Sequence, residues 1–313
     1  MKAAVISSFD RPPHYDNYAD PTPQGPREIL VEVLAAGLHH VTRGQASGVH
    51  YSGSGVLPLV PGIDGVGRGA DGKMRYFVQG PGQIGTMADR TVVELDHSIE
   101  LPSDSDAITV AGAMNPAMAS WLALRCRMPF QRGQKVLILG ATGSSGSMAV
   151  QIAQHLGASQ VIAAGRDEQK LAKLVAIGAT EIVPLGDARL GLLAHEVDVV
   201  LDFIWGESTV RIMEIVLKHR QDRCQPLTWI HVGSMAGETA AIPGATLRST
   251  NLQIVGSGYG SVSGRQIIME LPALAREIVR GTFRIDVKAI PLSNVEQAWS
   301  EAAHTNQRIV FTP

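Results

Sequence analysis

The chain has 313 residues, of which 45% are hydrophobic and 18% charged, and its formal net charge is −2. This length is enough for two domains that each bury a core. The composition gives no indication of a disordered chain, a coiled coil or a nucleic-acid-binding surface.

The two cysteines, Cys126 and Cys224, lie far apart and form no CxxC motif. They argue against a disulfide framework and against a thiolate-rich zinc site. We expect both side chains to be buried, as is usual for cysteines of this kind.

The first residues, MKAAVISSFD, lack the apolar core of a secretory signal. No uninterrupted apolar run approaches the roughly 20 residues that are needed to span a bilayer. The sequence therefore predicts a cytoplasmic protein that binds neither a membrane nor a nucleic acid.

Residues 1–110 contain short segments rich in valine and isoleucine, such as 28-EILVEVLAAG-37, separated by glycine and proline. This pattern predicts an antiparallel, partly barrel-like β domain with long connections. Residues 261–313 return to a helix and a short strand, and we expect them to rejoin the first domain.

Residues 111–260 have a different rhythm, because continuous apolar strands such as 136-VLIL-139 alternate with helical stretches. A parallel sheet that is covered on both faces requires this alternation. The segment therefore predicts a doubly wound α/β domain. The predicted core positions of its first two helices are Met148, Ile152, Leu156, Leu171, Leu174 and Val175.

The turn 141-ATGSSG-146 lies between an apolar strand and an amphipathic helix. It matches the GxGxxG dinucleotide fingerprint, with alanine in the first place and Gly140 just before it. Gly143 lets the backbone approach a pyrophosphate, Gly146 lets the helix pack on the strand, and the helix N-terminus supplies amide donors. The alternative is a purely structural turn. The predicted cofactor contacts are Ala141, Thr142, Gly143, Ser144, Ser145 and Gly146.

The end of the next strand distinguishes NADP from NAD. An NAD site places an acidic residue about 20 positions after the turn, whereas this chain has Gly165 and Arg166 there. A glycine makes room for a 2′-phosphate and a guanidinium pairs with it, while Lys170 adds a second cation on the same helix face. The alternative is that both cations are solvated charges at a helix start. We predict NADPH as the cofactor.

Small residues also follow two later strands of the predicted sheet. Gly233 and Ser234 come after 229-WIHV-232, and Ser257 and Gly258 come after 252-LQIVG-256. Ligands bind at the carboxyl ends of parallel strands, so these four residues are further predicted cofactor contacts. The alternative is that they are ordinary turn residues.

The chain resembles the medium-chain dehydrogenase/reductase superfamily, in its zinc-independent quinone oxidoreductase-like branch. The resemblance rests on the GATGSSG turn and on five segments that follow each other in the expected order: 58-PLVPGIDGVGRG-69, 85-GTMADRTVVEL-95, 115-NPAMASWLAL-124, 289-AIPLSNVEQAW-299 and 307-QRIVFTP-313. It implies a GroES-like substrate domain made from both ends of the chain, with a Rossmann domain inserted. It also implies reduction of quinones, enones or related carbonyls by NADPH, and a homodimer.

The resemblance also bears on metal ions. His39, Ile63 and Asn115 stand where the alcohol dehydrogenases of this superfamily have their catalytic zinc ligands. Isoleucine cannot bind zinc, and one imidazole with one amide makes a poor site. We therefore expect metal-free chemistry.

Without a metal, a side chain must donate a hydrogen bond or a proton to the substrate oxygen. The resemblance places Tyr51 in the substrate pocket and His39 and Asn115 near the nicotinamide. We predict Tyr51 as the first donor and His39 as the second, and Asp64 as a structural acid behind them. The alternative for His39 is a loop histidine bound to the backbone.

Two other functions remain open at this point. One is reduction of an enoyl thioester, which the same motifs serve equally well. The other is a sensor or crystallin-like protein that binds NADPH without turning it over, because a fold alone does not guarantee catalysis.

Overall fold

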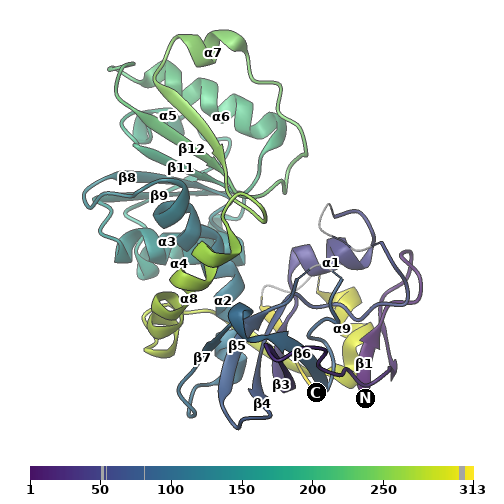
Figure 1. Cartoon of the computed structure of the whole chain (residues 1–313). Helices are drawn as coiled ribbons and strands as arrows, with labels where there is room; N and C mark the ends of the chain where they lie inside the picture. Colours follow the sequence, from purple (N-terminus) through teal and green to yellow (C-terminus); the bar gives the residue numbers. More distant parts are fainter. Residues whose placement is uncertain (51–52, 54, 81, 303–306) are drawn as a thin grey trace. The chain divides into compact units, whose positions relative to one another are not determined.

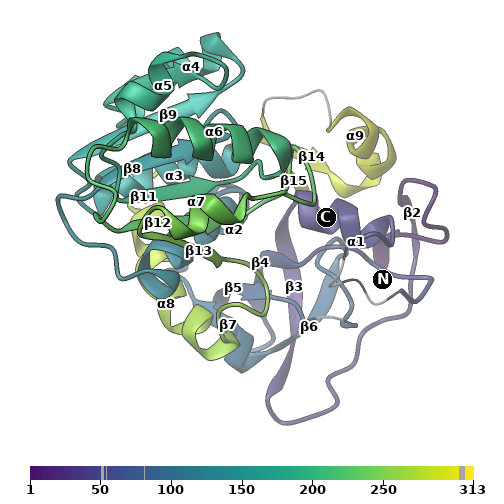
Figure 2. The ribbon, with the colours of Figure 1, turned by 90° about the horizontal axis from the view of Figure 1, so that it is seen from above.

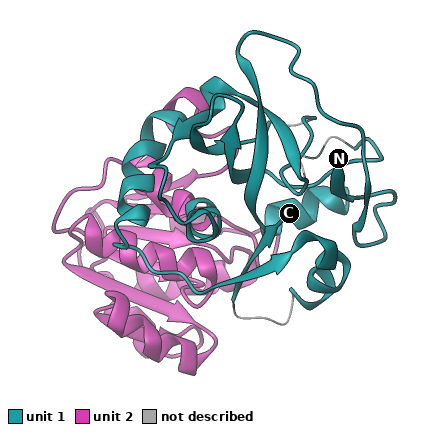
Figure 3. Ribbon diagram, turned by 90° about the horizontal axis from the view of Figure 1, so that it is seen from below, with its two compact units in different colours: residues 1–115, 267–313 teal, residues 116–266 magenta. Residues whose placement is uncertain are grey.

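The computed structural model describes residues 1–50, 53, 55–80, 82–302 and 307–313. These residues form two compact units, shown in different colours in Figure 3. Unit 1 contains Met1–Asn115 and Ile267–Pro313, and unit 2 contains Pro116–Gln266. Both ends of the chain thus belong to one unit, with the second unit inserted between them, and the predicted α/β fold class is confirmed.

The divisions between the units fall inside two helices, α2 (Ala107–Leu122) and α8 (Gly264–Val279). Each helix begins in one unit and ends in the other. The divisions expected after residues 110 and 260 lie near the starts of these helices. A change in the hydrophobic pattern of the sequence marks where a helix starts, but it does not show where along the helix the packing passes from one unit to the other.

Within its described residues, unit 1 contains a 7-stranded, mostly antiparallel sheet with the order β14-β15-β3-β4-β5-β7, and β6 pairs with β3 (Figure 1). A second, two-stranded sheet joins β1 and β2. The strands are β1 (Lys2–Val5), β2 (His14–Asn17), β3 (Glu28–Gly37), β4 (Asp64–Gly69), β5 (Met74–Val78), β6 (Arg90–Glu94), β7 (Ser98–Glu100), β14 (Val287–Pro291) and β15 (Arg308–Thr312).

The last strand of the chain, β15, lies between β14 and β3. Its Val310 and Phe311 are almost completely buried and share a sheet with Val31 and Val33 of β3. Helices α1 (His40–Ala46) and α9 (Val295–Glu301) complete this unit. The carboxyl end therefore helps to build the same core as the first hundred residues.

Unit 2, all of whose residues are described, contains a 6-stranded parallel sheet with the order β10-β9-β8-β11-β12-β13. The chain moves outward from β8 to β10, then crosses to the other side of β8 and continues from β11 to β13. The strands are β8 (Lys135–Leu139), β9 (Gln160–Gly165), β10 (Glu181–Pro184), β11 (Val199–Asp202), β12 (Leu227–His231) and β13 (Leu252–Gly256).

Helices flank this sheet, as predicted for a doubly wound fold (Figure 2). They are α3 (Ser144–His155), α4 (Glu168–Leu174), α5 (Arg189–Leu193), α6 (Gly206–His219) and α7 (Gly244–Arg248). Met148, Ile152, Leu171 and Leu174 are buried as expected, whereas Leu156, at the C-cap of α3, is only half-buried. Val175 is 56% exposed, so its predicted core position was wrong. The helix tightens into a 3-10 turn at Val175, which carries this side chain off the buried face.

One helical segment in the described part of the chain, Ala107–Arg127, is long and apolar enough to cross a membrane by length and composition. The sequence prediction had recognised no such segment, because its apolar residues are interrupted. Two thirds of its most apolar window, 67%, is buried inside the protein. This is the burial expected of a core helix.

Neither cysteine is in a disulfide. The prediction that both are buried was wrong, because Cys224 is exposed and Cys126 is partly exposed. Cys224 lies in the connection between α6 and β12, where its amide donates to Asp222. A connection of this kind runs over the surface.

Candidate functional site

The predicted dinucleotide turn joins β8 to α3 at the carboxyl edge of the parallel sheet. Gly140 begins it with φ +84°, a left-handed conformation that favours glycine. Gly143 caps α3 without any side-chain hydrogen bond. The first amides of the helix are therefore left to an external acceptor, and a phosphate is the group that a helix N-terminus attracts.

The helix lies very close to this turn. A Cβ added at Gly146 would stand 2.2 Å from the carbonyl oxygen of Gly140 and 2.6 Å from Cα of Ala141. No other residue fits there without moving the backbone. At Gly143 the nearest atom to an added Cβ is 3.6 Å away, so the space above this residue is open. The two glycines thus have different roles, one in packing and one in leaving room for a ligand.

Gly165 is the last residue of β9, the strand next to β8, and Arg166 follows directly after it. A Cβ at Gly165 would meet the Thr142 side chain at 2.6 Å, so this glycine makes room for the turn itself. Arg166 is exposed and forms no ion pair with any described residue. Its guanidinium is available for an anion at the ribose end of a dinucleotide.

Lys170 lies one turn into α4 but is already engaged. Its Nζ is 3.7 Å from Oδ2 of Asp167, and its backbone amide donates to Oδ1 of the same residue, which caps the helix. Lys170 must leave Asp167 before it can reach a phosphate. Of the two predicted cations, Arg166 is therefore the better placed.

The carboxyl ends of β12 and β13 lie on the other side of β8. Ser234 Oγ is 3.3 Å from Nε2 of His231, and the amide of Gly233 donates to the Asp202 carbonyl at the end of β11. Ser257 is buried and its amide donates to the His231 carbonyl, while Gly258 is exposed. The fold thus places these four predicted contacts along the same sheet edge as the turn.

His39, Asp64 and Tyr76 form a buried polar network in unit 1. Asp64 accepts the Tyr76 hydroxyl at 2.7 Å through Oδ2, and its Oδ1 contacts Nε2 of His39. His39 and Asp64 are each 1% exposed, and Tyr76 is fully buried. Nδ1 of His39 has no hydrogen-bond partner in the described structure.

Burial raises the pKa values of two groups in this network. It raises the pKa of Asp64 to about 7, although the Tyr76 hydroxyl lowers it. Burial also raises the pKa of Tyr76 well above its usual range, and the nearby Asp64 charge adds to this. Sequence reasoning named His39 and Asp64 but missed both their contact and Tyr76. The contact joins residues 25 positions apart, so no local pattern reveals it.

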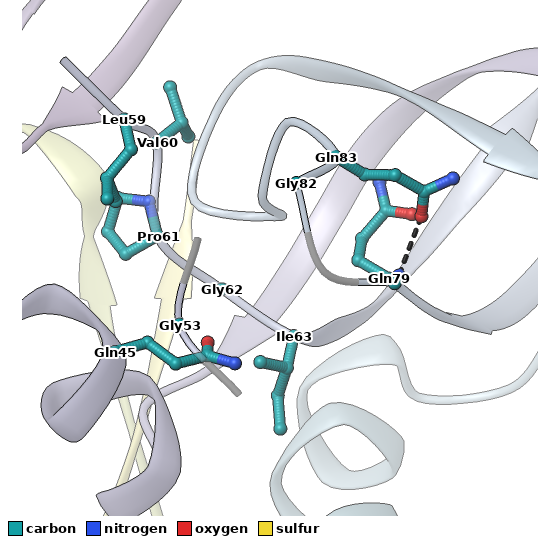
Figure 4. Close-up of a pocket in the computed structure, with 11 residues that line it drawn as sticks. Gln45, Gly53, Leu59, Val60, Pro61, Gly62, Ile63, Gln79, Gly82 and Gln83 are labelled. Carbon is teal, nitrogen blue, oxygen red and sulfur yellow. Dashed lines mark hydrogen bonds between the residues drawn. The ribbon is translucent and has the colours of Figure 1, made fainter. Parts of the chain in front are cut away.

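Unit 1 contains a pocket whose lining includes Ile63, the residue directly before Asp64 (Figure 4). Residues of α1, of the segment 59–63 and of the segment 79–83 line about 460 Å³ of space open to solvent. Gln45 and Ile63 point toward this space, and Ile63 directly precedes Asp64. Tyr51, the predicted proton donor, lies outside the described residues.

The described residues contain no cluster of three or more His, Cys, Asp or Glu side chains that could hold a metal ion. His39 is engaged with Asp64, and Ile63 has no donor atom. Asn115 is the last residue of unit 1, inside α2 just before Pro116, and its side chain is half-buried. These three residues do not form a zinc site.

Comparisons with known proteins identify relatives of the chain. No protein-family model matches the chain. A probable NADPH-dependent quinone reductase of Emericella nidulans is 28% identical over 100% of both chains. An NADPH-dependent alkenal/one oxidoreductase of Arabidopsis thaliana is 27% identical over 56% of this chain and 50% of its own length. The solved quinone oxidoreductase of Thermus thermophilus, also studied in complex with NADPH, superposes with a TM-score of 0.82 at 23% identity over 100% of both chains.

The raised pKa of Asp64 predicts a pH-dependent stability. Because the folded protein holds this proton more tightly than the unfolded chain, the stabilising contribution is complete below pH 3.8 and is lost as the pH rises through about 7. We expect the free energy of unfolding to fall across this range. In Asp64→Asn the fall should be smaller, because the amide does not titrate.

Urea unfolding at a series of pH values measures the free energy of unfolding of each protein. The exposed Asp104→Asn variant is the control, and equal slopes in all three proteins would contradict the assignment.

Proposed function

Because the chain belongs to the medium-chain dehydrogenase/reductase superfamily, in its quinone oxidoreductase branch, we propose that it is an NADPH-dependent reductase of quinones or α,β-unsaturated carbonyls. The observation that carries the proposal is the open phosphate turn at Gly143 with Arg166 at the end of the adjacent strand. Two relatives, a probable NADPH-dependent quinone reductase and an NADPH-dependent alkenal/one oxidoreductase, support it.

The carboxyl edge of the sheet in unit 2 would hold the cofactor. The first amides of α3 would donate to its pyrophosphate, and Arg166 would pair with its 2′-phosphate. When bound, NADPH supplies the hydride.

Hydride addition to an enone leaves negative charge on the substrate oxygen, and a proton must arrive to complete the reduction. We assign the hydrogen bond to the developing oxyanion to Tyr51, whose phenol is uncharged while it donates. If Tyr51 also gives up its proton, it becomes a phenolate and takes a proton back from water before the next turnover. His39 is the second choice, because its ring is 1% exposed and so has little direct access to a substrate. Asp64 holds His39 by Nε2, and Nδ1 of this ring is buried without a hydrogen-bond partner in the described structure.

Arg166→Ala is expected to weaken NADPH binding by about ten- to a hundred-fold, since hydrogen bonds to charged groups contribute about 1.5–3 kcal/mol. NADH binding should be unchanged, because NADH has no 2′-phosphate. Calorimetric titration with both cofactors measures this. The exposed Lys173→Ala variant, one turn further along α4, is the matched control. Equal weakening of both cofactors by Arg166→Ala would refute the phosphate contact.

Tyr51→Phe is expected to lower kcat by about a hundred-fold or more with an enone acceptor, because it removes the donor. NADPH affinity should stay the same. Steady-state assays following NADPH absorbance measure both parameters, with Tyr15→Phe as the control. Unchanged kcat in Tyr51→Phe would move the donation to His39. If the wild-type protein binds NADPH but does not oxidise it with any of the acceptors tested, the protein is a sensor and not a reductase.

We also propose that the protein forms a homodimer along β13. This strand is at the edge of the parallel sheet, and Leu252, Ile254 and Val255 on it are only half-buried. Large apolar side chains are exposed nearby, at Leu247 and Tyr259. A free edge with apolar side chains pairs readily with a second copy.

Light scattering after size-exclusion chromatography tests the dimer. The wild-type protein should have twice the mass of the chain, and Val255→Lys should give the monomer, because a charged edge residue opposes strand pairing. Glu181→Lys on β10, the opposite edge strand, is the control and should remain dimeric. A monomeric wild type, or a dimeric Val255→Lys, would contradict the proposed interface.

A cytoplasmic location is part of this proposal. Its support is chemical: Cys224 is exposed and outside any disulfide, a state that persists in a reducing compartment.

A further inference from the structure

Trp205, between β11 and α6, has an unusual backbone conformation. Its φ is 54° and its ψ is −165°, a region that is almost exclusive to glycine. Among the described residues, it is the one non-glycine with a positive φ. Strain of this kind persists when the surrounding structure enforces it, and it occurs most often at functional sites.

Asp202 enforces this conformation from the end of β11. Its Oδ1 accepts the amides of Ile204 and Trp205 at 2.9 and 3.0 Å. Its Oδ2 accepts the Thr209 hydroxyl at 2.7 Å and Nε1 of Trp229 at 2.9 Å. The carboxylate is completely buried, and its four donors come from the loop, α6 and β12. The backbone around Trp205 is thus fixed from three sides.

The ring of Trp205 rests against His231 at the end of β12. The two ring centroids are 4.4 Å apart and the planes are inclined by 42°. His231 in turn contacts Ser234, with Nε2 and Oγ 3.3 Å apart. Trp205 and His231 are both half-exposed. The two rings therefore pack against each other at the edge of the sheet, and both remain partly exposed to solvent.

This pair lies next to the phosphate turn. β11 pairs with β8 on one side and with β12 on the other, with Leu139 opposite Asp202 and Asp202 opposite His231. A Cβ added at Gly140 would meet the Ile204 side chain at 3.0 Å. The loop that carries Trp205 is thus in contact with the first residue of the turn.

The direction of the cofactor follows from the sheet order. Arg166 marks the 2′-phosphate end at β9, and the turn after β8 marks the pyrophosphate. The other half of the dinucleotide must continue over β11 and β12. We propose that the Trp205 ring, braced by His231, forms the wall against which the nicotinamide half of NADPH packs, and that Asp202 is the positioning residue for this ring.

The inference rests on the proposed function, since it takes NADPH as the cofactor. The alternative is that Trp205 only supports the fold, because its ring also packs in part on the core formed with α6. In that case, loss of the ring should weaken the binding of every ligand of the turn equally. A wall for the nicotinamide half affects NADPH and spares ligands that lack this half.

The test compares Trp205→Gly with the wild type. Glycine adopts this backbone conformation without strain, so the substitution removes the ring and keeps the loop. Calorimetric titrations with NADPH and with adenosine 2′,5′-bisphosphate, which has the 2′-phosphate but no nicotinamide, give the dissociation constants. We expect the NADPH constant to rise about ten-fold, as for the loss of one aromatic stacking contact, and the bisphosphate constant to stay the same.

Two further variants guard the test. Trp205→Phe keeps an aromatic ring and is expected to bind NADPH within about three-fold of the wild type. Asp202→Asn can accept fewer of the four donors and should weaken NADPH more than the bisphosphate, which separates positioning from general instability.

The possible results are distinguishable. A Trp205→Gly protein that binds NADPH as tightly as the wild type overturns the inference, as does one that loses both ligands equally. If Trp205→Gly does not fold, equal weakening of both ligands by Asp202→Asn overturns it. Failure of the wild type to bind NADPH overturns the proposed function itself.

Discussion

The close approach of α3 to the end of β8 is the constraint on which the candidate site depends. Gly146 brings the helix so near to the turn that an added Cβ would stand 2.2 Å from the Gly140 carbonyl oxygen. This contact aims the first amides of α3 over the edge of the sheet instead of into a neighbouring side chain. The positive end of the helix and its unused donors then meet in one place, which is what an anion requires.

The sheet order distributes the rest of the chemistry around this point. Because β8 is central, its two neighbours carry different functions at the same edge. β9 ends in Gly165, and the guanidinium of Arg166 directly after it attracts a negative group. β11 ends in Asp202, whose four hydrogen bonds shape the loop that presents Trp205. The charged side chain of Arg166 and the aromatic ring of Trp205 therefore lie on opposite sides of the phosphate turn. This order matches that of a dinucleotide, in which the pyrophosphate lies between the two nucleosides.

Much of this arrangement can be predicted from the sequence, because it is encoded locally. The alternation of apolar strands and helices predicted the parallel sheet, and the spacing in 141-ATGSSG-146 located the turn. Arg166 was predicted as a phosphate contact because its position is counted from that turn. Residues of this kind depend on neighbours within a few positions along the chain.

The features that sequence reasoning missed depend on long-range contacts. Asp64 meets His39 across 25 positions, and Trp229 reaches Asp202 across 27. The signal at Asp202 was a carboxylate directly after the apolar run 199-VVL-201, but the pattern alone does not say whether the acid faces a ligand or holds a loop. The conformation of Trp205 has no local signature at all, since tryptophan disfavours it.

The central claim is that the bound cofactor delivers its hydride to a carbonyl-activated substrate. The most direct measurement uses NADPH that carries deuterium at the transferred position of the nicotinamide, together with an enone and, in parallel, a quinone. We expect NADPH to be consumed and the saturated product of the enone to contain one deuterium on its β-carbon. NADPH that binds but is oxidised by neither acceptor, or a product without deuterium, would contradict the account.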